Sequence, residues 1–218
     1  MKTKNSITKS PFIALLGFFV IIGAVVLFLI EKGDFVLFCS ENRTPFFNVF
    51  FKITTKIVEE KIMFLILAIL LWFRFGTAFM TALTWGVGGA IAQSLKRVFA
   101  FDRPASFFQE TETLNFITSG VSYYFSFPSG HTTAAFAIFS MIAFCSDKKW
   151  VHILCFFIAL MVGFSRIYLL QHFFMDIYAG AILGTGVSYL LFAGMKKYAI
   201  FGFDKWKDKS LRKEFRLG

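Results

Sequence analysis

The chain has 218 residues, of which 57% are hydrophobic and 20% aromatic, and it carries a formal net charge of +10. Its mean hydropathy of +0.67 lies outside the range of soluble globular domains. The composition therefore excludes a soluble domain and predicts an integral membrane protein of the all-α class.

Apolar windows along the chain predict its transmembrane helices. Residues 12–30, 75–95, 116–146 and 177–195 contain no Asp, Glu, Lys or Arg, and each window is long enough to cross a bilayer core. Residues 62–73 and 150–165 form two shorter spans that must recruit neighbouring residues, including an Arg74 that can snorkel. We therefore expect six transmembrane helices in a single membrane-embedded domain, residues 1–195, followed by a basic tail, residues 196–218.

An amphipathic helix is predicted between the first two spans. Over residues 46–59 the polar side chains fall on one helical stripe, opposite the apolar ones. The polar stripe consists of Asn48, Lys52, Thr55 and Glu59. Such a helix is typical of a membrane surface, and we expect this one on the outer side.

The distribution of Lys and Arg orients the chain, because these residues accumulate in cytoplasmic loops. With both termini inside, the inner face carries the net positive charge and the outer face is neutral. The first apolar stretch is long for a signal peptide and no small-residue cleavage site follows it, so we interpret it as the first transmembrane helix. The basic tail is interpreted as a cytoplasmic anchor on anionic lipid and not as a nucleic-acid site, because no base-reading signature accompanies it.

Several residues are assigned no chemistry. Cys39, Cys145 and Cys155 have neither a close pair nor a metal-type spacing, so they predict neither a disulfide framework nor a zinc site. His152 lies near the inner end of the fifth span, and no polar residues that would suggest a site accompany it. We therefore interpret it as a structural residue.

The stretch SRIYLLQHFFMD, residues 165–176, places ionisable side chains inside an apolar run, and such residues indicate a functional site. If this run is helical, Ser165, His172 and Asp176 share one face. Asp176 can then accept a hydrogen bond from one ring nitrogen of His172 and leave the other nitrogen free as a nucleophile. The guanidinium of Arg166 suits a phosphate in geometry and charge.

Two more motifs on the same predicted side carry matching chemistry. KRVFAFDRP places Lys96 and Arg103 two turns apart at the outer end of the third span, where Pro104 is expected to stop the helix. FPSGHTTAAF opens the fourth span with a turn in which Ser129, Gly130 and the free amides of a helix N-terminus can hold an oxyanion. His131 beside them can protonate a departing alcohol.

Together these side chains predict phosphoryl transfer. Three cations and a helix N-terminus can bind a phosphate, one histidine faces it, and a second histidine can move a proton. No cluster of carboxylates in these motifs can hold Mg²⁺. We therefore expect no cofactor and a metal-free reaction through a phosphohistidine.

The three motifs resemble the signature of the type 2 phosphatidic acid phosphatase superfamily, and the resemblance extends over roughly residues 60–195. All the fixed positions match in order and spacing: Lys96, Arg103, Pro104, Pro128, Ser129, Gly130, His131, Ser165, Arg166, His172 and Asp176. The resemblance implies that His172 is the nucleophile, that Asp176 orients it and that His131 is the acid. It also implies phosphate binding by Lys96, Arg103, Ser129, Gly130 and Arg166.

A lipid phosphate is the expected substrate. Residues 104–127 form a long loop without Lys or Arg but with seven aromatic side chains, which suits a membrane interface and a side entrance for a lipid. The composition is similar to that of bacterial family members, which dephosphorylate lipids on the outer leaflet of the inner membrane. The resemblance favours lipid A, with undecaprenyl pyrophosphate close behind and phosphatidylglycerol phosphate or phosphatidic acid as further alternatives.

Two other classes of function remain open at this point. A lipid phosphotransferase would use the same phosphohistidine and pass the phosphoryl group to a second alcohol. A transporter or scaffold would keep the motifs without catalysis. Only measurements of phosphate release and of variants at His172 distinguish these classes.

Overall fold

The computed structural model describes residues 10–111, 113–118 and 120–198, and the side chains up to residue 195. Over these residues the chain is all-helical and has no strand, which confirms the predicted fold class. Residues 199–218 of the predicted basic tail and the first lysines of the chain lie outside the described residues. The helices are α1 (Pro11–Leu29), α2 (Asp34–Glu41), α3 (Pro45–Lys56), α4 (Glu60–Phe73), α5 (Phe75–Phe99), α6 (Pro104–Phe107), α7 (Gly130–Phe144), α8 (Lys149–Tyr168) and α9 (Phe174–Tyr198).

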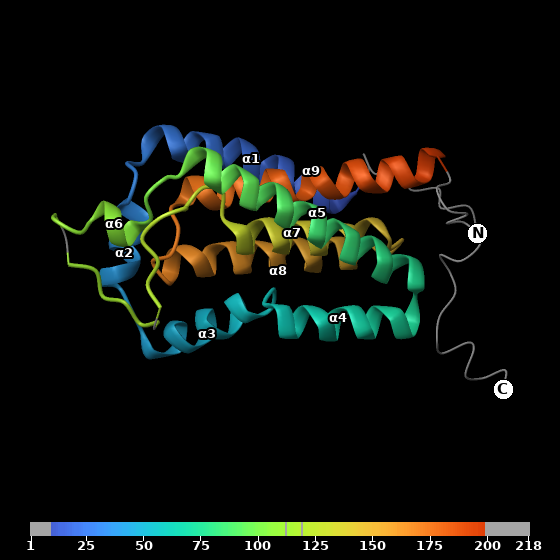
Figure 1. The fold of residues 1–218 in the computed structure, drawn as a ribbon, viewed down its shortest axis with the longest axis horizontal. Helices are drawn as coiled ribbons and strands as arrows, with labels where there is room; N and C mark the ends of the chain where they lie inside the picture. The colour runs from blue at the N-terminus through green and yellow to red at the C-terminus, as the bar shows by residue number, and fades with distance from the viewer. Residues whose placement is uncertain (1–9, 112, 119, 199–218) are drawn as a thin grey trace.

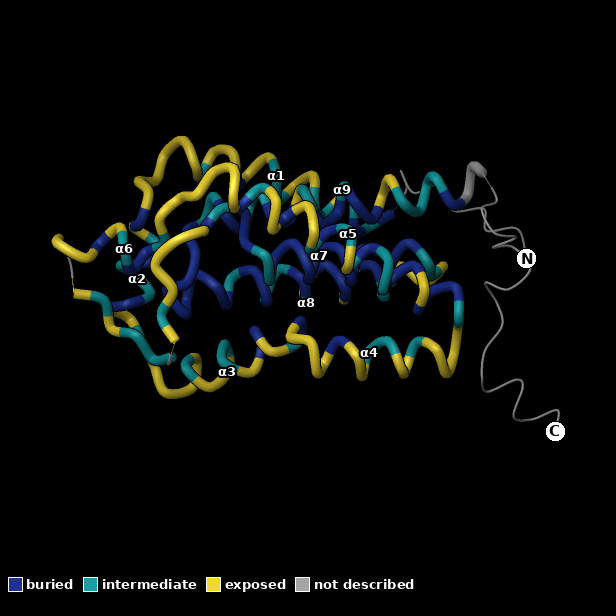
Figure 2. The backbone as a smooth tube through the Cα atoms, viewed as in Figure 1, coloured by how far each residue is buried: buried dark blue, intermediate teal, exposed yellow. Residues whose placement is uncertain are grey.

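The helix α7 forms the centre of a bundle and packs against α5, α8 and α9 (Figure 1). Nearly all of its side chains are buried, as the dark blue tube shows (Figure 2). α1 covers α8 and α9, and α4 packs on α5. Because α7 is apolar on every side, it is stable only when other helices surround it.

Two glycines of α9 allow it to approach α7 closely. A Cβ atom on Gly180 would lie 3.0 Å from the carbonyl oxygen of Ser129, and one on Gly184 would overlap the backbone of Thr133. A side chain at either position would force the two helices apart. The contact therefore fixes the start of α9 against the start of α7.

The lengths of the helices can be compared with the six predicted transmembrane spans. The helices α1, α5, α8 and α9 are long and apolar enough to cross a bilayer. α7 and α4 are shorter, with 15 and 14 residues. Large apolar side chains such as Phe18 and Phe28 of α1 are exposed, as expected for a surface that faces lipid. The chain is a membrane protein, and the count of six spans stays a prediction.

The predicted amphipathic segment overlaps α3, which begins at Pro45, after the N-cap Thr44, and ends at Lys56, before the predicted boundary. Its polar stripe turns toward α8, where Asn48 accepts a hydrogen bond from Tyr168 and Thr55 accepts one from Arg166. Apolar side chains on the other side are exposed: Phe46, Val49, Phe50 and Ile53. Its position on a membrane surface stays a prediction. The short helix α2 was not anticipated from the sequence.

His152 has polar partners that the sequence did not indicate. Its Nδ1 lies 2.7 Å from Oγ of Ser10, and its Nε2 lies 2.9 Å from the carbonyl oxygen of Ser146. The expectation that His152 has no polar neighbours is therefore wrong. The contacts join the start of α1 to the turn between α7 and α8 at the end of the bundle away from the predicted site.

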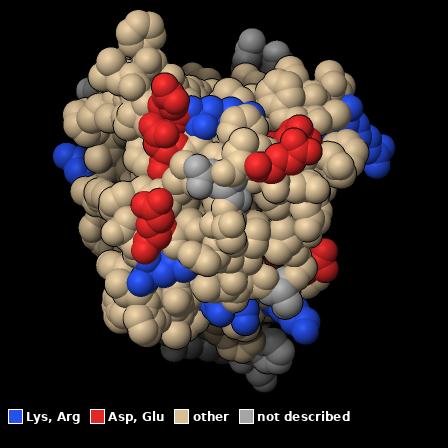
Figure 3. Space-filling view, turned by 90° about the vertical axis from the view of Figure 1, so that its left-hand side faces the viewer, with Lys and Arg blue, Asp and Glu red and all other residues tan. Residues whose placement is uncertain are grey.

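The two ends of the bundle differ. α2, α3, α6 and the long loop after α6 gather at one end, whereas α1 begins and α9 ends at the other (Figure 1). Seen from the loop end, charged side chains of both signs lie scattered among other residues (Figure 3). That this end is the outer face of the protein stays a prediction.

Candidate active site

The first motif lies where α5 ends. Lys96 occupies the last turn of α5, and the helix stops at Phe99 because Ala100 adopts a left-handed conformation with φ of 46°. Arg103 follows outside the helix. The expectation that Pro104 stops this helix is wrong, since the helix ends earlier and Pro104 instead opens α6.

A short peptide segment, residues 123–126, holds both cations of the first motif. Nζ of Lys96 donates to the carbonyl oxygen of Phe125 at 2.6 Å and approaches that of Ser126 at 3.4 Å. Nε of Arg103 donates to the carbonyl oxygen of Tyr124 at 2.9 Å. We call this segment the strap. Because carbonyl oxygens partly balance the two positive charges, the cations can lie side by side below the surface.

The second motif forms the N-terminus of α7. Ser129 is the N-cap, is fully buried, and its Oγ accepts a hydrogen bond from Oγ1 of Thr132 at 3.0 Å. Gly130 starts the helix, and a Cβ there would lie only 3.7 Å from the side chain of Lys96. The free amides of this helix end and the ammonium of Lys96 therefore face a common volume, which suits an anion.

The third motif spans a break between two helices and not a continuous helix. α8 ends at Tyr168, Leu170 adopts a left-handed conformation with φ of 57°, and α9 begins at Phe174. The assumption of one helical run is therefore wrong. His172 and Asp176 are nevertheless in contact, with 3.2 Å between Nδ1 and Oδ2.

Asp176 is fixed by several donors. Its Oδ2 accepts a hydrogen bond from the backbone N–H of Phe173 at 2.9 Å, and the Oγ of Ser126 also donates to it. It lies in the first turn of α9, where the helix dipole favours a negative charge. Its backbone carbonyl accepts from the N–H of Ser129, which ties the third motif to the second.

Arg166 reaches the same region from the last turn of α8. The residue is 9% exposed, and its Nη1 donates to Oγ1 of Thr55 at 2.7 Å. Its Nε is buried and has no hydrogen-bond partner among the described residues. Because an unpaired donor of a charged group is unfavourable in a buried place, this atom is suited to an anionic ligand.

The structure brings the titratable residues of the three motifs together. Electrostatic interactions connect Lys96 with Arg103, Asp176 and Arg166, and they connect His131 with all three cations and with His172. His131 also lines a cavity of about 750 Å³, next to Gly130. All eight predicted site residues therefore belong to one cluster, which supports the reasoning from their spacing.

Burial lowers the pKa of two side chains that lie outside the helices. It lowers the pKa of His172 to about 3, although the hydrogen bond and the charge of Asp176 act in the opposite direction. Burial also lowers the pKa of Arg103, again against the charge of Asp176. His172 is therefore neutral at ordinary pH, as a nucleophilic imidazole must be.

Three polar partners of the site were missed from the sequence. Ser126 contacts His172 and Asp176, Gln171 accepts a hydrogen bond from Nη1 of Arg103 at 3.2 Å, and Thr55 holds Arg166. None of them occupies a fixed position of the three motifs. Gln171 could have been found from its place beside His172 in the third motif, whereas the polar stripe that contains Thr55 gave no indication that it contacts the site.

Two cavities adjoin the cluster, and both are lined by Gln93. The first, which we call the groove, has a volume of about 750 Å³ and lies between the start of α4, residues 85–93 of α5 and the start of α7. The second, which we call the mouth, has a volume of about 410 Å³ and is lined by Lys96, Arg103 and the strap. The cluster is therefore reached from two directions.

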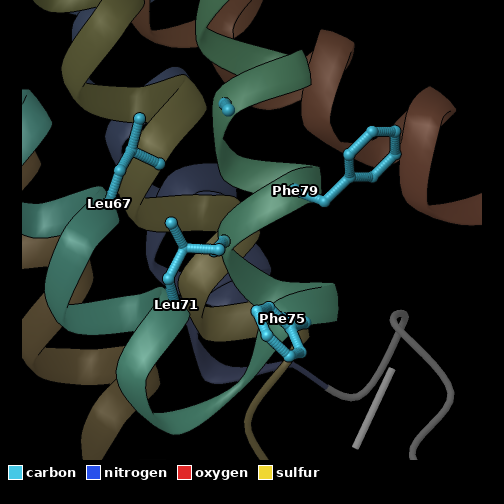
Figure 4. Close-up of a pocket in the computed structure, with 6 residues that line it drawn as sticks. Leu67, Leu71, Phe75 and Phe79 are labelled. Atoms are coloured by element: carbon cyan, nitrogen blue, oxygen red, sulfur yellow. The ribbon is translucent and has the colours of Figure 1, made fainter. Parts of the chain in front are cut away.

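A third cavity lies away from the cluster. It has a volume of about 370 Å³ between the end of α4 and the start of α5, where Leu67, Leu71, Phe75 and Phe79 line it (Figure 4). Its lining is wholly apolar, and it contains no group suited to chemistry. No group of three or more His, Cys, Asp or Glu side chains that could hold a metal ion occurs in the described part of the chain.

Comparison with known proteins identifies the family. The family model described as "PAP2 superfamily" matches residues 77–199, which is more than half of the chain. The chain belongs to the PAP2 superfamily. This finding confirms the resemblance of the three motifs, all of which lie inside the matched region.

Two curated proteins are similar in sequence. Phosphatidylglycerophosphatase B of Bacillus subtilis is 38% identical over 90 residues, which cover 37% of this chain and 40% of that protein. A dihydrosphingosine 1-phosphate phosphatase of Schizosaccharomyces pombe is 28% identical over 201 residues, which cover 85% of this chain and 47% of that protein. The chain thus spans less than half the length of these curated relatives.

Two solved structures share the fold. LpxE of Aquifex aeolicus superposes with a TM-score of 0.67 at 26% identity, covering 74% of this chain and 94% of that one. A transmembrane PAP2-type phosphatidylglycerolphosphate phosphatase of Bacillus subtilis superposes with a TM-score of 0.64 at 22% identity, covering 87% of this chain and 98% of that one. The likeness to the second structure concerns the fold alone.

Proposed function

We propose that the protein is a membrane lipid phosphatase that hydrolyses a phosphate ester of a lipid headgroup through a phosphohistidine at His172. The observation that carries this proposal is the contact between Nδ1 of His172 and Oδ2 of Asp176, next to Lys96, Arg103 and Arg166. A neutral imidazole held beside three cations is suited to attack phosphorus.

In the first step the free Nε2 of His172 attacks the phosphorus while the ester oxygen departs. Asp176 accepts a hydrogen bond from Nδ1–H of His172, fixes the orientation of the ring and stabilises the positive charge that develops on the imidazole. The cations Lys96, Arg103 and Arg166 neutralise the phosphoryl oxygens, and Ser129 with the N–H of Gly130 adds hydrogen bonds at the start of α7. In the second step water attacks the phosphorus and gives a proton to His131, the bond between phosphorus and Nε2 of His172 breaks, and inorganic phosphate leaves.

His131 is proposed as the acid that protonates the leaving alcohol. Because it lines the groove, the part of the substrate beyond the ester oxygen extends into that cavity. The groove is open at its side, and its walls include small residues of α5 such as Gly86, Gly89 and Ala90. A lipid whose chains stay in the bilayer can present its headgroup there, which supports a lipid substrate over a soluble one.

Lipid A is our first choice of substrate, and undecaprenyl pyrophosphate remains an alternative. A specific observation favours phosphatidylglycerol phosphate as a second candidate, since phosphatidylglycerophosphatase B of Bacillus subtilis is 38% identical over 90 residues. A phosphotransferase using the same intermediate is the alternative reaction, and a non-enzymatic transporter or scaffold is the alternative of another class.

The cellular arrangement is part of the proposal. We place the protein in a bacterial cytoplasmic membrane with both termini inside, so that the cluster lies on the outer face. Residues 1–195 then form one membrane-embedded domain and residues 196–218 a cytoplasmic tail. The asymmetry of Lys and Arg in the sequence supports this orientation.

The test measures inorganic phosphate released by the purified protein from lipid A, undecaprenyl pyrophosphate, phosphatidylglycerol phosphate, phosphatidic acid and a soluble sugar phosphate. We expect release from at least one lipid, none from the sugar phosphate, and loss of release in His172→Ala. His152→Ala is the control, because this buried histidine lies at the other end of the bundle. Full activity of His172→Ala would overturn the proposed nucleophile, and phosphate moving between lipids without release would indicate a transferase.

A further inference from the structure

We propose that Ser126 is a positioning residue of the reaction, which holds Asp176 and thereby sets the tautomer and orientation of His172. The inference rests on the proposed function, because it concerns the same nucleophile. Ser126 belongs to none of the three motifs and lies three residues before Ser129.

The contacts of Ser126 place it between the two residues of the nucleophilic pair. The residue is fully buried, its Oγ donates to Oδ2 of Asp176, and the same Oγ lies 3.2 Å from Nδ1 of His172. A serine hydroxyl has one hydrogen and two lone pairs. With its hydrogen given to Asp176, the oxygen can only accept a hydrogen bond from His172.

This arrangement specifies the tautomer of the imidazole. The Nδ1–H of His172 has two acceptors on one side, Oδ2 of Asp176 and Oγ of Ser126, both at 3.2 Å. A proton on Nδ1 leaves the lone pair on Nε2, which is the nitrogen proposed to attack phosphorus. Ser126 therefore restricts the ring to the reactive tautomer and limits its rotation.

Ser126 also connects the nucleophile to the phosphate-binding cations, because it is the last residue of the strap. Its carbonyl oxygen and that of Phe125 accept from Lys96, and its N–H donates to the carbonyl oxygen of Phe101. Phe125 has a φ of 60°, an unfavourable conformation for a non-glycine residue that persists only where its surroundings hold it. One segment thus sets the distance between the cations and His172.

The experiment compares Ser126→Ala with Ser126→Thr and with the matched control Ser188→Ala. Ser188 is also fully buried, but its hydroxyl donates to the carbonyl oxygen of Ala137, within the bundle. Because a hydrogen bond to a charged group is lost, we expect Ser126→Ala to lower kcat by about 10- to 100-fold with little change in KM. Ser126→Thr keeps the hydroxyl and should recover most of the rate, and Ser188→Ala should keep it.

A double-mutant cycle separates positioning from simple structural support. If Ser126 acts through Asp176, Ser126→Ala should lower kcat much less in an Asp176→Ala background than in the wild type. Fully additive losses, or an unchanged kcat in Ser126→Ala, would overturn the inference even if the wild type releases phosphate. A wild type that releases no phosphate from any lipid would overturn the proposed function itself.

Discussion

At the scale of single residues, the proposed roles of His172 and His131 can be distinguished by comparing substrates with different leaving groups. In the proposed mechanism His172 forms and breaks the bond to phosphorus, whereas His131 gives a proton to an alcohol that leaves poorly. An aryl oxygen departs readily as a phenolate and has little need of that proton. The chemical nature of the leaving group therefore reports on His131 and not on His172.

We expect His131→Ala to lower kcat/KM for an alkyl lipid phosphate by about 10² to 10⁴, the usual contribution of a general acid. For an aryl phosphate such as p-nitrophenyl phosphate the loss should be much smaller. His172→Ala should abolish turnover of both esters. Equal losses for the two esters in His131→Ala would contradict its assignment as the acid.

The residues of the site could be predicted from the sequence because phosphoryl transfer requires particular side chains, and those stand out against an apolar background. The spacing of His172 and Asp176 suggested their contact correctly, although the reason given was incomplete. The chain reverses at Leu170, and the contact forms at the start of a new helix. Ser126 was missed because a serine near Gly and Pro is common in turns, and only the folded loop brings its hydroxyl to Asp176.

At the scale of helices, the composition predicted the long apolar elements but not the connections between them. α1, α5, α8 and α9 follow from hydrophobic length, which the bilayer requires. The apolar window of the fourth predicted span begins at residue 116, whereas α7 begins at Gly130, since apolar aromatic residues also occur in the preceding loop. Composition alone cannot distinguish a membrane helix from an aromatic loop over such a stretch.

The groove between α4, α5 and α7 leads to a prediction about these helices. Gly89 lines the groove, and a Cβ at this position would meet no atom within 4 Å. We expect Gly89→Leu to fill the groove without harming the helix, because leucine favours a helix over glycine by roughly 0.8 kcal/mol. Phosphate release from a long-chain lipid should fall at least about tenfold, whereas release from a short soluble ester should change little.

Gly17→Leu is the matched control, since Gly17 of α1 is also open on all sides and does not line the groove. Kinetics with a long-chain and a short ester, together with the melting temperature of each variant, complete the comparison. If Gly89→Leu handles the long-chain lipid as well as Gly17→Leu does, the leaving group does not occupy the groove.

At the scale of the whole molecule, the proposed chemistry needs only groups that the chain supplies. Vanadate adopts the five-coordinate geometry of the phosphoryl transition state and can bind a histidine nitrogen. We therefore expect micromolar to millimolar vanadate to inhibit the wild type in competition with substrate, and EDTA to leave the rate unchanged. Loss of activity in EDTA that Mg²⁺ restores would contradict the metal-free mechanism.

The two cavities that share Gln93 lie at different places: the groove between α4, α5 and α7, and the mouth beside the cations and the strap. A dephosphorylated lipid can diffuse back into the bilayer through the first, while water enters and inorganic phosphate departs through the second. The products then never compete for one exit. Bilayer composition should consequently govern the formation of the phosphohistidine, whereas phosphate in the aqueous phase should inhibit only by rebinding to the dephosphorylated site.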